Sequence, residues 1–110
     1  MCIQHFTLAK FRPTATAEQK EDAYLRVSLL LFGAAETIPG IKSFQVGPPI
    51  SKRGTRGYEF AVIVEFQDMQ AFIDFIPHAH HQMLADVIND FSDGKPLSYQ
   101  IDTTRPCAKL

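Results

Sequence analysis

Three of the four histidines in this chain fall within four positions, as His78, His80 and His81 in the stretch IPHAHHQML. Imidazole titrates near neutral pH, binds transition metals and can cap a helix, so such a cluster has three possible uses. The fourth, His5, lies in an N-terminal segment that alternates apolar and polar residues. The chemistry of the chain depends on which of these rings the fold brings together.

An acid–base role is the first interpretation of the cluster. Pro77 suits the first position of a helix, so we expect His78 to His81 in its opening turn. Free amide groups and the macrodipole disfavour positive charge there, and neighbouring histidines add to the effect. His81 is therefore expected to stay neutral and to act as a general base on carbon between two carbonyl groups. If the strand face that carries His5 meets the helices, His5 and His81 border one apolar pocket.

Two other interpretations stay open beside this one. A histidine at a helix start commonly caps the helix or lies on the surface, and His80 is expected to be of that kind, pointing away from His81. A metal site would need His5, His78 and His81 to converge. Neighbouring rings in HAHH diverge on a helix, and no Cys or Asp completes a tetrahedral set. We expect neither a metal nor haem, and no other cofactor.

Length and charge limit the class of protein. The 110 residues predict one domain over 1–104 and a tail over 105–110. The net charge of -1, with both signs dispersed, indicates no nucleic acid and no anionic membrane as partner. The two cysteines, Cys2 and Cys107, and the lack of a signal or spanning segment favour a reduced, cytoplasmic protein. The last residues, Ala-Lys-Leu, resemble a peroxisomal address.

The pattern of apolar residues predicts four strands and two helical regions. Strands are expected over 2–11, 41–47, 58–66 and 96–103, the third with the clearest alternation. A helix follows Thr16, which forms a capping box with Gln19, and ends at 38–40. Helical segments are expected over 68–76 and 78–91, interrupted by Pro77. The inward positions of the first helix are Tyr24, Val27, Leu31, Ala34 and Ile38.

The resulting order, β-α-β-β-α-β, predicts an α+β ferredoxin-like fold with one antiparallel sheet and both helices on one face. The opposite sheet face would carry Phe6, Leu8, Ala61 and Ile63. Since a single layer would leave these apolar groups exposed, we expect a homodimer in which two sheets pack together as a dimeric α/β barrel.

The segments IQHFTLAKF, TAEQKEDAY, IPGI, GYEFAVIVEF and DMQAFIDFIPHAHHQML together resemble the stress-responsive dimeric α/β-barrel (Dabb) domains, over about residues 2–102. The functional template in that family is the polyketide cyclase of the olivetolic acid cyclase type, a cofactor-free enzyme that closes a linear polyketide thioester by an aldol reaction. On that pattern, His81 matches the catalytic histidine and His5 the histidine of the first strand. Phe75 and Phe60 stand where the template has tyrosine and histidine.

The resemblance therefore implies a cofactor-independent, lyase-type cyclase that acts on a small apolar or aromatic polyketide-like substrate. Its catalytic residues would be His81 as base, His5 as partner and Tyr24 as hydrogen-bond donor in place of the missing tyrosine. Substrate contacts are expected from His78, Phe60, Phe75 and Tyr58, the last being a second candidate donor. The alternative is a non-catalytic stress-responsive dimer whose histidines only cap and hydrogen-bond. An enclosed pocket that holds both His5 and His81 would favour the enzyme.

Overall fold

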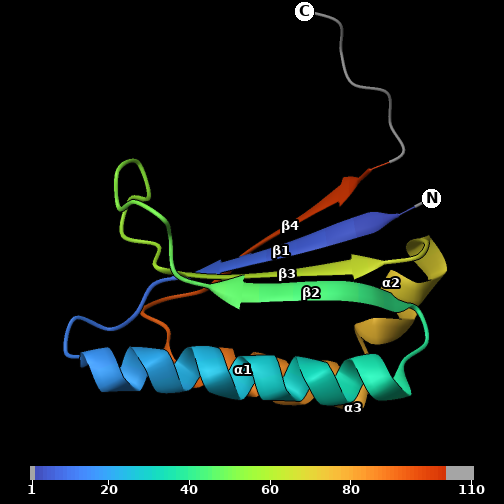
Figure 1. Ribbon diagram of the computed structural model, residues 1–110, viewed down its shortest axis with the longest axis horizontal. Helices are drawn as coiled ribbons and strands as arrows, with labels where there is room; N and C mark the ends of the chain where they lie inside the picture. Colours follow the sequence, from blue (N-terminus) through green and yellow to red (C-terminus); the bar gives the residue numbers. More distant parts are fainter. Residues whose placement is uncertain (1, 104–110) are drawn as a thin grey trace, which may run out of the picture.

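The computed structural model describes residues 2–103, so the expectations for the tail, including Cys107 and the Ala-Lys-Leu end, lie outside the described residues. Its elements are β1 (Ile3–Ala9), α1 (Ala17–Thr37), β2 (Ile41–Gly47), β3 (Phe60–Phe66), α2 (Met69–Phe75), α3 (Ala79–Phe91) and β4 (Leu97–Asp102). Every predicted strand and helical segment is present. The fold is the predicted ferredoxin-like α+β fold (Figure 1).

The four strands form one antiparallel sheet in the order β2-β3-β1-β4. The first strand lies in the middle, paired with β3 on one side and with the edge strand β4 on the other. In Figure 1, α1 and α3 run side by side along one face of this sheet, and α2 lies at its end. Since β1 faces the helices with alternate residues, Ile3, His5 and Ala9 are buried there.

The first helix begins and packs as its sequence predicts. The Thr16 hydroxyl accepts a hydrogen bond from the Gln19 backbone N–H, and the Gln19 side chain accepts one from the Thr16 N–H, which completes the capping box. From there the helix buries a stripe at three- and four-residue spacing against the sheet: Ala23, Val27, Leu31 and Ala34. This packing leaves the rest of the same sheet face to be covered by the second helical region.

The second helical region consists of two separate helices. Asp68 caps α2 by accepting from the Ala71 N–H at 2.8 Å, and the chain turns at Ile76 and Pro77 before α3 begins. The N-cap of α3 is His78, so Pro77 precedes the cap and does not occupy the first helical position we expected. The reason is that the imidazole of His78 itself supplies the capping acceptor. His81 remains in the first turn, as the third residue of α3.

The sheet face turned away from the helices carries the expected apolar residues. Phe6 pairs across β1 with Ile63 on one side and with Tyr99 on the other, and Leu8 pairs with Ala61 and Leu97. Exposed fractions reach 66% for Tyr99, 50% for Leu97 and 43% for Ile101. In residues 2–103, no helix is long and apolar enough to span a bilayer.

Candidate active site

His5 is a buried polar group in the middle of the sheet. It is 8% exposed, its ring lies 5.3 Å from that of Phe72 between centroids, and it faces the helices. Its Nδ1 lies 2.9 Å from the amide nitrogen of Gln100, the residue directly opposite on β4. Its Nε2 lies 3.4 Å from the Thr7 hydroxyl. Both ring nitrogens therefore have a polar neighbour, as a buried histidine requires.

His81 approaches the same place from α3. Residues 81, 84, 85 and 88 recur at helical spacing, so His81, Leu84, Ala85 and Ile88 form one face of that helix. This face looks onto the half of the sheet formed by β1 and β4. The His81 ring packs edge-on against the buried ring of Phe75, with 5.0 Å between the centroids. Phe75 thus restricts the positions that the imidazole can take.

Between these elements lies a cavity of about 230 Å³ that both histidines line, and it is partly open to solvent rather than enclosed as expected. Its volume is that of about eight waters of the liquid. His5, Leu84 and Ile88 are buried, while Asn89 and Ser98 are exposed, so the imidazole of His5 lies on the buried side and the amide and hydroxyl groups on the exposed side. The lining consists of His5, Thr7, His81, Leu84, Ala85, Ile88, Asn89, Pro96 and Ser98.

Burial determines the charge state of His5. Burial and, to a smaller extent, the nearby His81 ring together lower the pKa of His5 to about 4. His5 is therefore neutral at neutral pH and bears one N–H. A neutral ring inside an otherwise apolar strand face can donate or accept a hydrogen bond without placing a charge in the core.

The two tyrosines considered as donors lie elsewhere. The Tyr24 hydroxyl donates to the backbone carbonyl of Glu59 at 2.5 Å, and its ring stacks on Phe60 with 5.5 Å between centroids. Burial, with Glu59 and then Glu21, raises the pKa of Tyr24 to about 12. Tyr58 lies beneath the Lys10 ammonium, 4.9 Å from its ring centroid. Neither tyrosine lines the cavity of His5 and His81.

The remaining predicted contact residues also lie outside this cavity. Phe60 is buried in an aromatic cluster with Phe11 and Phe91. Phe75 reaches the site only through its contact with His81. His78 caps α3, and its ring stacks on that of His80 at 5.1 Å. The structure therefore brings together His5 and His81, with Phe75 behind, and separates both from Tyr24, Tyr58, Phe60 and His78.

His80 differs from the surface residue that its position suggested. Its ring is half-buried, and a side chain added at Gly33 of α1 would lie 3.9 Å from its Nε2. This distance is an ordinary van der Waals contact, so the imidazole of His80 lies against α1 at Gly33. Within the described chain, Nδ1 of His80 is buried with no hydrogen-bond partner.

Sequence reasoning missed four polar residues around the cavity. Thr7 and Ser98 are cross-strand partners, Asn89 follows the buried face of α3, and Gln100 contacts His5. The signal was present, because residues 98 and 100 share one face of β4 and Thr7 shares the face of His5. What could not be read was the register that sets Gln100 opposite His5.

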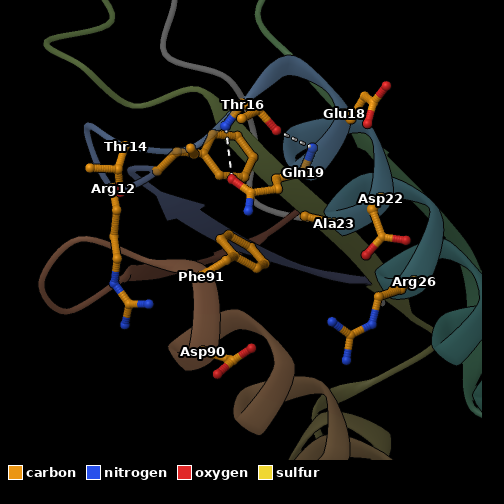
Figure 2. A pocket seen from close by; sticks show the side chains of 12 residues that line it. Arg12, Thr14, Thr16, Glu18, Gln19, Asp22, Ala23, Arg26, Asp90 and Phe91 are labelled. Atoms are coloured by element: carbon orange, nitrogen blue, oxygen red, sulfur yellow. Dashed lines mark hydrogen bonds between the residues drawn. The ribbon is translucent and has the colours of Figure 1, made fainter.

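A larger hollow of about 770 Å³ lies on the other side of α3, between its C-terminal end and the start of α1 (Figure 2). It is a surface groove, since its charged residues, Arg12, Glu18, Asp22, Arg26 and Asp90, are all exposed. Figure 2 shows Arg12 and Arg26 on opposite sides of Phe91. Size alone would favour this groove, but it contains no histidine, and the two hollows are about equally open to solvent. We therefore place the candidate active site at the smaller cavity.

Residues 2–103 contain no group of three or more His, Cys, Asp or Glu side chains arranged to hold a metal ion. The rings of His78 and His81 do not converge with that of His5 on one point, because His78 is turned to the helix start as a cap. The polar groups of the cavity are imidazole, hydroxyl and amide, a set suited to proton transfer and hydrogen bonding.

Solved structures confirm the fold. A dimeric ferredoxin-like protein of unknown function from Jannaschia matches with a TM-score of 0.78 at 18% identity, over 93% of this chain and 99% of that one. A protein of Arabidopsis thaliana matches with a TM-score of 0.74 at 21% identity, over 98% and 99%. A hydroxynitrile lyase from Passiflora edulis matches with a TM-score of 0.70 at 15% identity, over 96% and 97%.

These identities speak for the fold alone. No curated protein matches the sequence significantly. The family model described as the stress responsive A/B barrel domain, Dabb, matches residues 3–99, which is most of the chain. The protein belongs to the stress-responsive A/B barrel (Dabb) family.

Proposed function

We propose that this protein is a cofactor-independent acid–base enzyme of the polyketide cyclase type, which closes a small polyketide-like substrate by an aldol reaction. The observation that carries the proposal is the cavity of about 230 Å³ lined by both His5 and His81. One imidazole lies on a helix at the wall, and the other is buried in the sheet. Two rings of different environment on one small cavity suit a base and a hydrogen-bonding partner.

The reaction assigns one task to each group. His81 removes the proton from carbon between two carbonyls, and the C–H electron pair becomes that of an enolate. The enolate carbon attacks a second carbonyl carbon, a carbon–carbon bond forms, and the resulting alkoxide takes the proton back from His81. His5 stabilises the enolate oxygen. The Thr7 and Ser98 hydroxyls line the same cavity and replace Tyr24 as our candidates for binding the second carbonyl.

The lining also suggests how the substrate lies. Leu84, Ala85 and Ile88 offer an apolar wall, and Asn89 and Ser98 are exposed at the other side. An apolar chain or ring would pack against α3, while the thioester end would point to solvent. Five of the nine lining residues carry a polar group and four are apolar, so an apolar wall faces a set of hydrogen-bonding groups. The Passiflora hydroxynitrile lyase has the same fold, so cyanohydrin cleavage is a second reaction to assay.

A linear poly-β-keto thioester of N-acetylcysteamine tests the proposal directly. After the aldol step, loss of water and enolisation give the aromatic ring, and a water molecule hydrolyses the thioester to the acid with release of N-acetylcysteamine. This aromatic acid is separated by chromatography from the lactone that forms without enzyme. We expect wild-type protein to raise the yield of the aromatic acid, and His81→Gln to lower kcat/KM by about 10²-fold to 10⁴-fold. Gln82→Ala, at the exposed next position of α3, is the matched control and should leave the rate unchanged. No product above the spontaneous background on this thioester or a cyanohydrin would favour the non-catalytic dimer.

We also propose that the protein is a homodimer joined through the exposed sheet face. Tyr99, Leu97 and Ile101 are exposed beside Phe6 and Leu8 on that face, which is unusual for a monomer. The Jannaschia protein with the same fold is described as dimeric. Neither histidine belongs to this face, because both lie on the helix side of the sheet.

A further inference from the structure

The two ring nitrogens of His5 have neighbours of different kinds. An amide nitrogen can only donate a hydrogen bond, so Nδ1 of His5 accepts from the Gln100 side chain, 2.9 Å away. An accepting nitrogen carries no proton. The single proton of a neutral His5 ring must therefore be on Nε2.

That N–H is not used up by the protein. It contacts the Thr7 hydroxyl at 3.4 Å, beyond the usual 2.7–3.2 Å of an N–H···O hydrogen bond. Both His5 and Thr7 line the cavity. A substrate oxygen in the cavity can thus receive a shorter bond from Nε2–H than Thr7 does.

We propose that Gln100 is a positioning residue, which holds His5 in its Nε2–H tautomer so that His5 donates a hydrogen bond to the oxyanion of the substrate while His81 takes the proton. This inference rests on the proposed function and deepens it. It restricts the substrate to compounds whose carbonyl oxygen becomes negatively charged in the reaction, and it gives the two histidines roles that they cannot exchange.

The surroundings of His5 favour the donor role. Burial and the neighbouring His81 keep the pKa of His5 at about 4, which makes its ring a poor proton acceptor at neutral pH. A neutral imidazole N–H needs no deprotonation to serve as donor. During the reaction the proton moves from substrate carbon to His81 and back to the alkoxide, so His5 keeps its own proton throughout.

Gln100 can be changed without disturbing the core. It lies on the edge strand β4 and is exposed, while the ring it contacts is buried. Gln100→Glu keeps the size of the side chain and replaces the donor by a carboxylate, which only accepts. A carboxylate facing Nδ1 requires the proton there, and so turns Nε2 into an acceptor. Gln67→Glu, the same change at another exposed position, is the matched control.

The ring nitrogens can be observed without any substrate. In ¹⁵N-labelled protein at neutral pH, two-bond ¹H–¹⁵N spectra distinguish a protonated, pyrrole-like nitrogen from an unprotonated, pyridine-like one. We expect wild type and Gln67→Glu to show a pyrrole-like Nε2 and a pyridine-like Nδ1 for His5. Gln100→Glu should exchange the two. Backbone amide spectra check that each variant is folded.

Two results would overturn the inference: a pyrrole-like Nδ1 in the wild type, or an unchanged tautomer in Gln100→Glu. With the thioester as substrate, Gln100→Glu should lower kcat by about 10²-fold at nearly constant KM, the effect of losing one oxyanion donor. If wild-type His5 has the expected Nε2–H tautomer but the protein does not turn over the thioester, only the proposed function is contradicted. If the wild-type protein turns over the thioester but His5 carries its proton on Nδ1, only the proposed role of Gln100 is contradicted.

Discussion

Nδ1 of His78 accepts a hydrogen bond from the backbone N–H of His80 at 3.1 Å, and His78 is thereby the N-cap of α3. The cap satisfies one of the amide groups that every helix start leaves unpaired. Because His81 is the third residue of this helix, the cap also fixes the position of the helical turn that carries the candidate base. One histidine of the cluster thus has a structural task, while another lines the cavity.

Removing this cap should destabilise the protein. We predict that His78→Ala lowers the free energy of unfolding by about 1 kcal/mol, the usual cost of losing a helix cap. His78→Asp should restore most of it, because a carboxylate caps well and is favoured by the helix dipole. Urea denaturation followed by circular dichroism measures both changes. Equal stability of His78→Ala and wild type would show that the capping bond contributes nothing.

The buried His5 should make stability depend on pH. Its pKa is about 4 in the folded protein and 6.5 for an exposed ring, so the unfolded chain binds the proton more readily. The contribution of His5 to the free energy of unfolding is therefore fully present above pH 6.5. It is lost as the pH falls from 6.5 toward 4, and the loss amounts to about 3 kcal/mol at most.

Carboxylates also titrate in that range, so the measurement needs a reference that lacks the imidazole. We expect the stability difference between wild type and His5→Gln to fall between pH 7 and pH 4, in urea titrations at each pH, because only wild type loses this contribution. Above pH 7 the difference should be constant. A difference that does not vary with pH would mean that the His5 ring is not desolvated in the folded state.

The helices and strands, and the side of each that faces the core, could be predicted because they depend on local sequence patterns. Alternation in β1 and β3, the capping box at Thr16 and the stripe of α1 all depend on near neighbours in sequence. The pairing of His5 with Gln100 depends on the register between two strands that are 95 positions apart. Tyr24 was assigned correctly to the inward face of α1. Its separation from His5 could not be predicted, because it depends on where α1 packs along the sheet. The sequence therefore predicts which face of an element a side chain lies on, but not which side chains of neighbouring elements it meets there.

At Gly40 the backbone lies close to α2, and this contact helps to position α2 beside the candidate active site. A Cβ placed there would overlap the Cβ of Ala71 in α2, the helix that brings Phe72 against His5. We predict that Gly40→Ala destabilises the protein by about 1–3 kcal/mol through overpacking. Gly47→Ala is the control, since nothing lies within 4 Å of a Cβ at that glycine of β2.

A double mutant separates the steric clash from other effects of the substitution. In Gly40→Ala with Ala71→Gly, the offending methyl group is absent, so the two changes should be less harmful together than their sum, by about 0.5–3 kcal/mol. Thermal or urea unfolding of the four proteins gives this coupling energy. Additive effects would contradict a direct contact between the two positions.

The exposed sheet face should be the dimer interface. Tyr99 is 66% exposed and lies opposite Phe6, which in turn pairs with Ile63, so these three form one apolar row across the sheet. A charge in the middle of such an interface would be buried without a partner, at a cost of several kcal/mol. We predict that Tyr99→Glu converts the dimer to a monomer in light scattering after size-exclusion chromatography. Leu29→Glu is the control, because Leu29 is 62% exposed on α1, away from the sheet face, and should leave the mass unchanged. A monomeric wild type would contradict the proposed dimer, and a dimer disrupted only by Leu29→Glu would place the interface elsewhere.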